Sequence, residues 1–198
     1  NLKDAELSYR KAIELKPDSA DAYSNLGIIL KDIGNLKDAE LSYRKAIELN
    51  LYFAEAHSNL GNVLRALGNL KEAELSVRKA IELKPNYTIA HLNLGSILKD
   101  LDKLEEAELS FRKAIELKPD YADAYSYLGN VLKVLGNFQD AELYTRKAIE
   151  LNPYSAEAHL NLGNILIYHS NLQGAEILYR KAIELKPDYA DAYSSLGN

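Results

Sequence analysis

The stretch AELSYRKAIEL at residues 39–49 recurs along the chain and decides its fold. Its first residue has copies at a constant spacing of 34 residues, at Ala5, Ala39, Ala73, Ala107, Ala141 and Ala175. A Leu-Gly pair keeps the same spacing, with its leucines at Leu26, Leu60, Leu94, Leu128, Leu162 and Leu196. No insertion or deletion interrupts this register. A fixed period of this length predicts an array of stacked structural repeats.

The first helix of each repeat is predicted from residues such as 20–34. The apolar residues spaced to share one helical face there are Ala22, Leu26, Ile29 and Ile33. Asp18 precedes the segment as the expected capping side chain, and Asp21 places a carboxylate in the first turn. Gly34 is expected to end the helix.

A second helix is predicted over residues 36–49. Its expected inner stripe consists of Leu36, Ala39, Tyr43 and Ala46. Proline cannot continue a helix and therefore ends the equivalent helices of other repeats, at Pro85, Pro119, Pro153 and Pro187. Each repeat is thus expected to be a pair of short helices, with small residues where the two helices approach closely.

These positions resemble the tetratricopeptide repeat. The matching residues of one unit are Tyr23, Leu26, Gly27, Leu30, Ala39, Tyr43 and Ala46, followed by proline at the unit end in most copies. The resemblance covers the whole chain and implies an all-α solenoid that winds into a right-handed superhelix. It also implies that the first helices line an inner groove.

The register divides residues 1–198 into one array. We expect a partial unit at 1–19 that holds only a second helix, five full units at 20–53, 54–87, 88–121, 122–155 and 156–189, and a partial first helix at 190–198. Because no polar capping helix stands at either end of this sequence, we also expect end-to-end self-association.

The composition excludes several kinds of site. The chain has no cysteine, which excludes disulfides and thiolate sites, and its net charge is only −5. No apolar run has the length of a membrane span. We expect a cytoplasmic protein that does not bind membranes. Nucleic-acid binding is not expected either, because carboxylates four residues away flank the arginine of each Arg-Lys pair in the second helices.

Polar columns of the first helices are the candidate binding residues. One asparagine per repeat, at Asn25, Asn59, Asn93 and Asn161, forms a first column in which Tyr127 is an interruption. Asparagine offers donors and an acceptor, so a row of them suits the backbone of an extended peptide. The column is similar to the asparagine ladder of the repeat superhelix of O-GlcNAc transferase. The alternative is that these side chains bond within the repeats.

Further columns lie beside the first. A second asparagine column consists of Asn62, Asn130, Asn164 and Asn198, and a basic column of Lys31, Arg65, Lys99 and Lys133. An acidic column at the helix starts consists of Asp21, Glu55, Asp123, Glu157 and Asp191. The charged columns either select ligand charge or only complement the helix dipoles.

No catalytic constellation, cofactor motif or metal site stands out. Three of the four histidines, at His57, His91 and His159, occupy one column whose members lie at least one repeat apart, too far for a shared metal. We therefore expect a non-enzymatic scaffold that binds a peptide or protein segment in its groove. The alternatives are the substrate-presenting arm of a larger enzyme, such as a glycosyltransferase, and a self-assembling structural solenoid.

Overall fold

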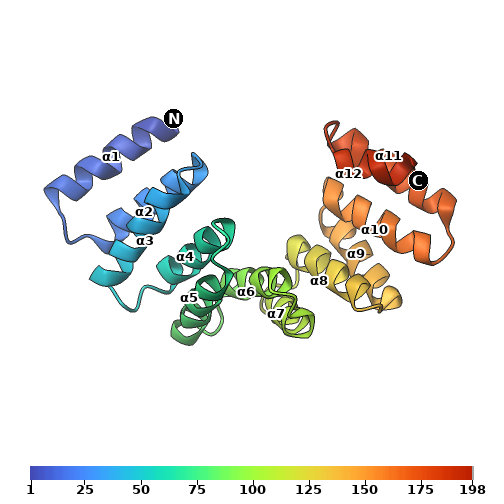
Figure 1. The fold of residues 1–198 in the computed structure, drawn as a ribbon, viewed down its shortest axis with the longest axis horizontal. Helices are drawn as coiled ribbons and strands as arrows, with labels where there is room; N and C mark the ends of the chain where they lie inside the picture. Colours follow the sequence, from blue (N-terminus) through green and yellow to red (C-terminus); the bar gives the residue numbers. More distant parts are fainter. Residues whose placement is uncertain (198) are drawn as a thin grey trace. The chain divides into compact units, whose positions relative to one another are not determined.

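A computed structural model describes residues 1–197 as helices joined by short turns, and Asn198 lies outside the described residues (Figure 1). The helices are α1 (Leu2–Leu15), α2 (Ala20–Asp32), α3 (Leu36–Leu49), α4 (Ala54–Ala66), α5 (Leu70–Leu83), α6 (Thr88–Asp100), α7 (Leu104–Leu117), α8 (Ala122–Val134), α9 (Phe138–Leu151), α10 (Ala156–Tyr168), α11 (Leu172–Leu185) and α12 (Ala190–Gly197). The predicted all-α solenoid is confirmed. No helix among these residues has the length and apolar character to cross a bilayer.

The helix ends follow from local side chains. Ser19, rather than the predicted Asp18, caps α2 by accepting a hydrogen bond from the backbone N–H of Ala22. Gly34 follows α2 with a φ of 84°, a conformation that glycine adopts without steric cost. The equivalent turn before α11 holds Ser170 at a φ of 57°, where a side chain is strained.

Each hairpin buries small residues between its two helices. Ala39 and Ala46 of α3 are fully buried, as the predicted stripe requires. The predicted face of α2 is wrong at one end, because Ile33 is 41% exposed. Leu30, at 1% exposure, completes that face instead, since the helix ends at Asp32 before Ile33 can turn inward.

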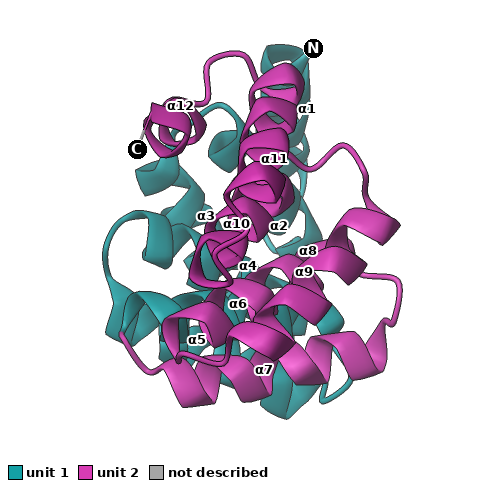
Figure 2. Ribbon diagram, turned by 90° about the vertical axis from the view of Figure 1, so that its right-hand side faces the viewer, with its two compact units in different colours: residues 1–101 teal, residues 102–198 magenta. Residues whose placement is uncertain are grey.

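The chain forms two compact units (Figure 2). Unit 1 is Asn1–Leu101 and contains α1 to α6, and unit 2 is Asp102–Asn198 and contains α7 to α12. The boundary falls between α6 and α7, where Asp102 adopts a φ of 60°.

Within each unit the two kinds of helix form separate layers. In unit 1 the first helices α2, α4 and α6 contact one another in succession, and in unit 2 α8 contacts α10. The second helices α1, α3 and α5 are separated by hollows that reach down to the first helices. The first helices therefore pack close together on one face of each unit, which is called here the inner face. The second helices, which lie farther apart, form the outer face.

Candidate functional site

The asparagines of unit 1 lie on the inner layer in two different states. Asn25, Asn59 and Asn93 are half-buried at equivalent positions of α2, α4 and α6. Asn93 Nδ2 donates a hydrogen bond to Ser58 Oγ at 3.1 Å and so links α6 to α4. Within residues 1–197, Asn25 and Asn59 have no hydrogen bond from their side chains to the protein. Two members of the predicted column thus have no side-chain partner within the described residues, and the third is engaged.

The same column in unit 2 is engaged internally. Asn161 is only 5% exposed, and its Oδ1 accepts a long hydrogen bond from Asn130 Nδ2 at 3.5 Å. The Asn161 Nδ2 atom is buried with no partner among the described residues. Tyr127, which interrupts the column, packs its ring 5.6 Å from that of Phe111. These side chains join helices of unit 2 to one another.

The second asparagine column also divides. Asn62 is half-buried on α4. Asn164 lies on α10, where its Oδ1 accepts a hydrogen bond from the Tyr179 hydroxyl at 2.9 Å. That bond fixes the amide orientation, so the two N–H groups of Asn164 Nδ2 remain as donors. Asn198, the last member, lies outside the described residues.

Much of the charge in the basic and acidic columns is paired. Arg65 Nε donates to Asp100 Oδ2 at 2.6 Å, and Lys31 lies 3.3 Å from Asp32. Lys99 is half-buried at the end of α6. In the acidic column Glu55 pairs with Lys84 at 2.7 Å, and this hydrogen bond lowers the pKa of the Glu55 carboxyl.

One hollow of unit 2 brings predicted site residues together. This inner pocket has a volume of about 510 Å³ and is lined by Lys133, Asn164, Ile167, Tyr168, Leu172, Tyr179 and Ser195. Lys133 and Asn164 belong to the predicted columns. Leu172 and Tyr179 come from α11 and were not predicted, because the repeat pattern marks their columns as structural.

The inner pocket combines apolar surface with polar groups. Ile167, Tyr168 and Leu172 are 43%, 64% and 66% exposed, unusually open for such side chains. Stacking on Phe138 holds the Tyr168 ring, with 4.1 Å between the centroids. Lys133 adds a cation, and Asn164 adds fixed amide donors. The pocket can therefore hold an apolar side chain while a backbone carbonyl or a carboxylate accepts from these donors.

The histidine column has a structural role. The Nε2 atoms of His57, His91 and His159 lie 3.2, 2.8 and 3.0 Å from backbone carbonyl oxygens six residues earlier in the chain. Each ring thereby ties the start of its helix to the preceding turn. No group of three metal-ligating side chains occurs among residues 1–197.

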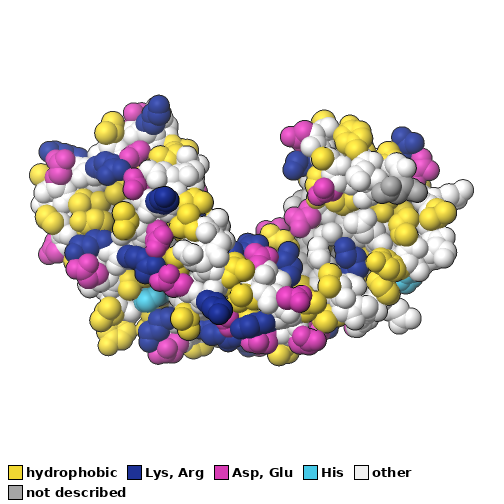
Figure 3. Space-filling view, in the orientation of Figure 1, with side chains coloured by type: hydrophobic (Ala, Val, Ile, Leu, Met, Phe, Trp, Pro, Cys, Tyr) yellow, Lys and Arg dark blue, Asp and Glu magenta, His cyan; other side chains and the backbone are white. Residues whose placement is uncertain are grey.

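The outer face carries paired charges. Arg44 pairs with Glu40 at 2.8 Å, and Glu48 pairs with Lys45 at 2.7 Å rather than with Arg44. Equivalent pairs recur along the second helices. In Figure 3 basic and acidic side chains are accordingly interspersed over the visible surface. Each of these arginines therefore lies beside a carboxylate of its own helix.

Comparison with protein-family models gives one consistent result. A model described as Tetratricopeptide repeat matches residues 20–51, 54–87 and 122–155, and a second model of the same description matches 156–189. A model described as TPR repeat matches residues 1–34 and 95–136. No curated protein sequence matches the chain.

Solved structures with the same fold include several TPR proteins. YrrB, a TPR protein with an unusual peptide-binding site, is 28% identical over 96% of this chain and 98% of its own, with a TM-score of 0.71. MamA is 25% identical over 83% of this chain and 96% of its own, with a TM-score of 0.71. PilF of Pseudomonas aeruginosa is 22% identical over 98% and 88%, with a TM-score of 0.84, and shows the fold alone.

Proposed function

Because the chain belongs to the tetratricopeptide repeat family of protein–protein interaction scaffolds, we propose that its inner face binds an extended peptide segment without catalysis. The inner pocket of unit 2 is the observation that carries the proposal. It combines the exposed apolar side chains of Ile167, Tyr168 and Leu172 with the oriented amide of Asn164. The peptide-binding site of YrrB supports the same reading.

The chemistry of the pocket defines the expected segment. An apolar side chain of the peptide enters between Tyr168 and Leu172, where about 25 cal/mol is gained per Å² of apolar surface removed from water. A backbone carbonyl of the peptide accepts from Asn164 Nδ2. A carboxylate, either from an acidic side chain or from the peptide C-terminus, lies near Lys133. The preferred ligand is therefore an apolar residue followed or preceded by a negative charge.

The asparagines of unit 1 add a second, backbone-directed contact region. Asn25 and Asn59 are the members of the predicted ladder that no hydrogen bond within the described residues engages. Each would contribute about 1 kcal/mol through a bond to a peptide amide, equivalent to about fivefold in affinity. Asn93 and Asn161 are poorer choices for a binding test, because each hydrogen-bonds to a first helix of the neighbouring repeat, whereas the bond of Asn164 to Tyr179 stays within one hairpin.

A peptide array probed with the purified chain tests the proposal. Peptides that carry an apolar residue beside a carboxylate should bind, and Asn164→Ala should weaken their binding about fivefold or more. Gln173→Ala, an exposed position on α11 outside the pocket, is the matched control and should leave affinity unchanged. Circular dichroism checks that both variants keep their helices. Equal binding by Asn164→Ala and the chain itself would exclude the pocket as the site.

Other expectations from the sequence stay predictions. They are the division into five full units, the cytoplasmic location and the end-to-end self-association. The role as an arm of a larger enzyme also stays a prediction, and finding a catalytic domain in a longer chain would test it. The TPR fold itself is typical of non-catalytic scaffolds.

A further inference from the structure

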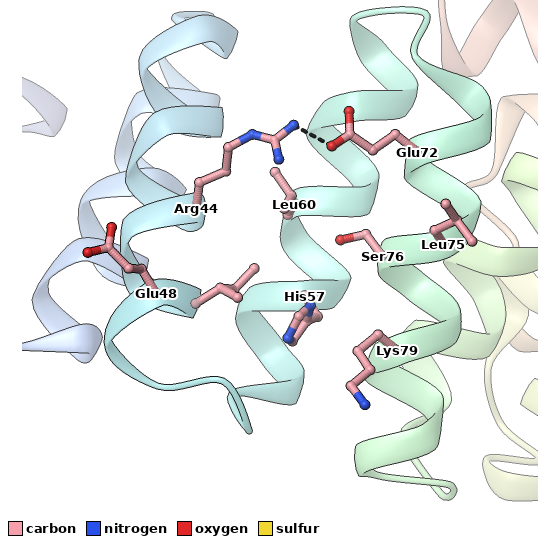
Figure 4. A pocket seen from close by; sticks show the side chains of 9 residues that line it. Arg44, Glu48, His57, Leu60, Glu72, Leu75, Ser76 and Lys79 are labelled. Atoms are coloured by element: carbon pink, nitrogen blue, oxygen red, sulfur yellow. Dashed lines mark hydrogen bonds and ion pairs between the residues drawn. The ribbon is translucent and has the colours of Figure 1, made fainter.

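The outer face of unit 1 has two hollows that lie one repeat apart. The smaller, of about 260 Å³, lies between α1 and α3 over α2. The larger, of about 480 Å³, lies between α3 and α5 over α4 and is called here the outer pocket (Figure 4). Both are built from the same columns, since Ser42 and Leu41 of the first correspond to Ser76 and Leu75 of the second.

The outer pocket is apolar inside and charged at its rim. Leu60 of α4 lies between the two second helices, and Leu75 of α5 is 69% exposed at the side. Arg44 of α3 spans the opening to Glu72 of α5, with 2.6 Å between Nη2 and Oε1 (Figure 4). Ser76 lies below this ion pair, and its short side chain leaves the space open.

Unit 2 shows what the equivalent space accepts. Ser76 corresponds to Tyr144, which lies 68 positions later in the same column. The Tyr144 ring lies 6.0 Å from that of Tyr125, the counterpart of His57. Arg112, the counterpart of Arg44, donates to the Tyr144 hydroxyl at 2.7 Å. The chain thus fills this position of unit 2 with a phenol group of its own.

Charge complementarity explains why a phenol suits the position. The Arg112 guanidinium lies 5.1 Å from the centroid of the Tyr144 ring, so the cation meets the electron-rich ring as well as the hydroxyl oxygen. Arg112 keeps its bond to Glu108 of its own helix, and the phenol takes the place of a second carboxylate. Arg44 has the corresponding bond to Glu40, and Glu72 is its exposed second partner.

We propose that the outer pocket of unit 1 binds a tyrosine side chain presented by another protein. The ring would pack on Leu60 and Leu75, and its hydroxyl would accept from Arg44 in place of Glu72. This site lies on the opposite layer from the asparagines, and it does not depend on the peptide site of unit 2. A scaffold with both sites holds two partners at once.

Binding of p-cresol, the side-chain analogue of tyrosine, tests the proposal on the full chain. Nuclear magnetic resonance titration should show saturable shifts of the backbone amides of Leu75 and Ser76. Toluene, which lacks the hydroxyl, should bind about fivefold more weakly because it cannot accept from Arg44. These shifts report on unit 1, so they are independent of the peptide array.

Variants taken from the chain's own repeats make the test sharp. Ser76→Tyr copies the arrangement of Tyr144 and should fill the outer pocket, abolishing the p-cresol shifts at Leu75. Ser76→Ala keeps the pocket open and should bind as the chain itself does. Tyr144→Ser should open the equivalent space and create new p-cresol shifts at Arg112.

Three results would overturn the proposal. The first is an absence of p-cresol shifts at Leu75 and Ser76, and the second is their persistence in Ser76→Tyr. The third is a shift of the same signals when the protein alone is concentrated. That result would identify a second copy of the chain as the occupant, with Tyr52 or Tyr154, each 81% exposed, as the inserted side chain.

Discussion

Replacing Tyr43 by phenylalanine should stabilise the protein. The Tyr43 side chain is fully buried between α2 and α3, and its hydroxyl oxygen has no hydrogen-bond partner among the described residues. Burying a hydroxyl group without a partner costs about 1–3 kcal/mol. The gap left by one oxygen atom costs only a few tenths of a kcal/mol. Tyr43→Phe should therefore raise the free energy of unfolding by about 1–2 kcal/mol.

The same substitution has a signature at high pH. Burial, and secondarily the charge of Asp32, raises the pKa of Tyr43 above its ordinary value of 10.0. The folded state favours the neutral phenol of Tyr43. The contribution of this pKa shift to the free energy of unfolding is therefore complete below pH 10 and is lost as the pH rises above 10 toward the folded pKa. The advantage of Tyr43→Phe over the unmodified chain should therefore widen above pH 10.

Tyr179→Phe is the matched control in the same column. Its hydroxyl donates to Asn164 Oδ1 at 2.9 Å, so its removal should destabilise the chain by about 0.5–1.5 kcal/mol. Phe111 already occupies this column in another repeat, so phenylalanine is compatible with the packing. The two substitutions remove the same atom and should have opposite signs.

Thermal and urea unfolding followed by circular dichroism measure both effects. For a chain of this length each kcal/mol shifts the Tm by about 2–4 °C. Repeat arrays do not always unfold in one step. Nuclear magnetic resonance signals from several repeats should therefore be followed alongside the circular dichroism. A Tyr43→Phe variant that is no more stable than the parent would refute the reasoning and show that the hydroxyl has a partner, such as a trapped water.

Three more substitutions test the packing and the turns. Gly61→Ala should cost about 1–3 kcal/mol in urea unfolding, because its Cβ would clash with Val77 and lie 3.0 Å from the Ala73 carbonyl oxygen; unchanged stability would contradict the close approach. Ser170→Gly should add about 0.5–1 kcal/mol by relieving the positive φ, which calorimetry would detect, and a lower Tm would show that the turn is unstrained. Burial lowers the pKa of His57 below 6.5, so its share of stability is present above pH 6.5 and is lost as the pH falls through the folded pKa. His57→Tyr, which copies the residue of other repeats, should remove this acid-induced loss of stability. Identical acid unfolding curves for the variant and the unmodified chain would disprove the role of His57.

The helices are the part of the fold that local sequence predicts well. Turn residues such as Gly34 and Pro85 stop helices through their own backbone geometry, and the spacing of Ala39 and Ala46 marks a buried face by itself. The errors are also local. Ser19 caps α2 in place of Asp18, one residue away, and Ile33 turns outward because the helix ends just before it.

The candidate sites are only partly predictable from columns. Asn59 and Asn93 are equivalent in sequence, and each has a serine 35 residues earlier, Ser24 and Ser58, yet only Asn93 bonds to that serine. Arg65 is likewise engaged within the protein, because its Nε donates to Asp100, which lies 35 residues later in the sequence. Such pairs depend on which side chains face each other across two helices. The residues of one sequence column do not show which residues of a neighbouring helix they contact.

The sequence by itself determined the period, the helix pairs and the buried stripes, because these follow from backbone preferences and from apolar spacing within one repeat. The tertiary structure decided which of the repeated side chains form hydrogen bonds with neighbouring helices. Packing of α10 on α11 places Asn164 beside Tyr179 in the inner pocket, and packing between repeats leaves the outer pocket open at Ser76 while Tyr144 fills the equivalent space. Those outcomes depend on distances between helices, which the sequence of one helix does not encode.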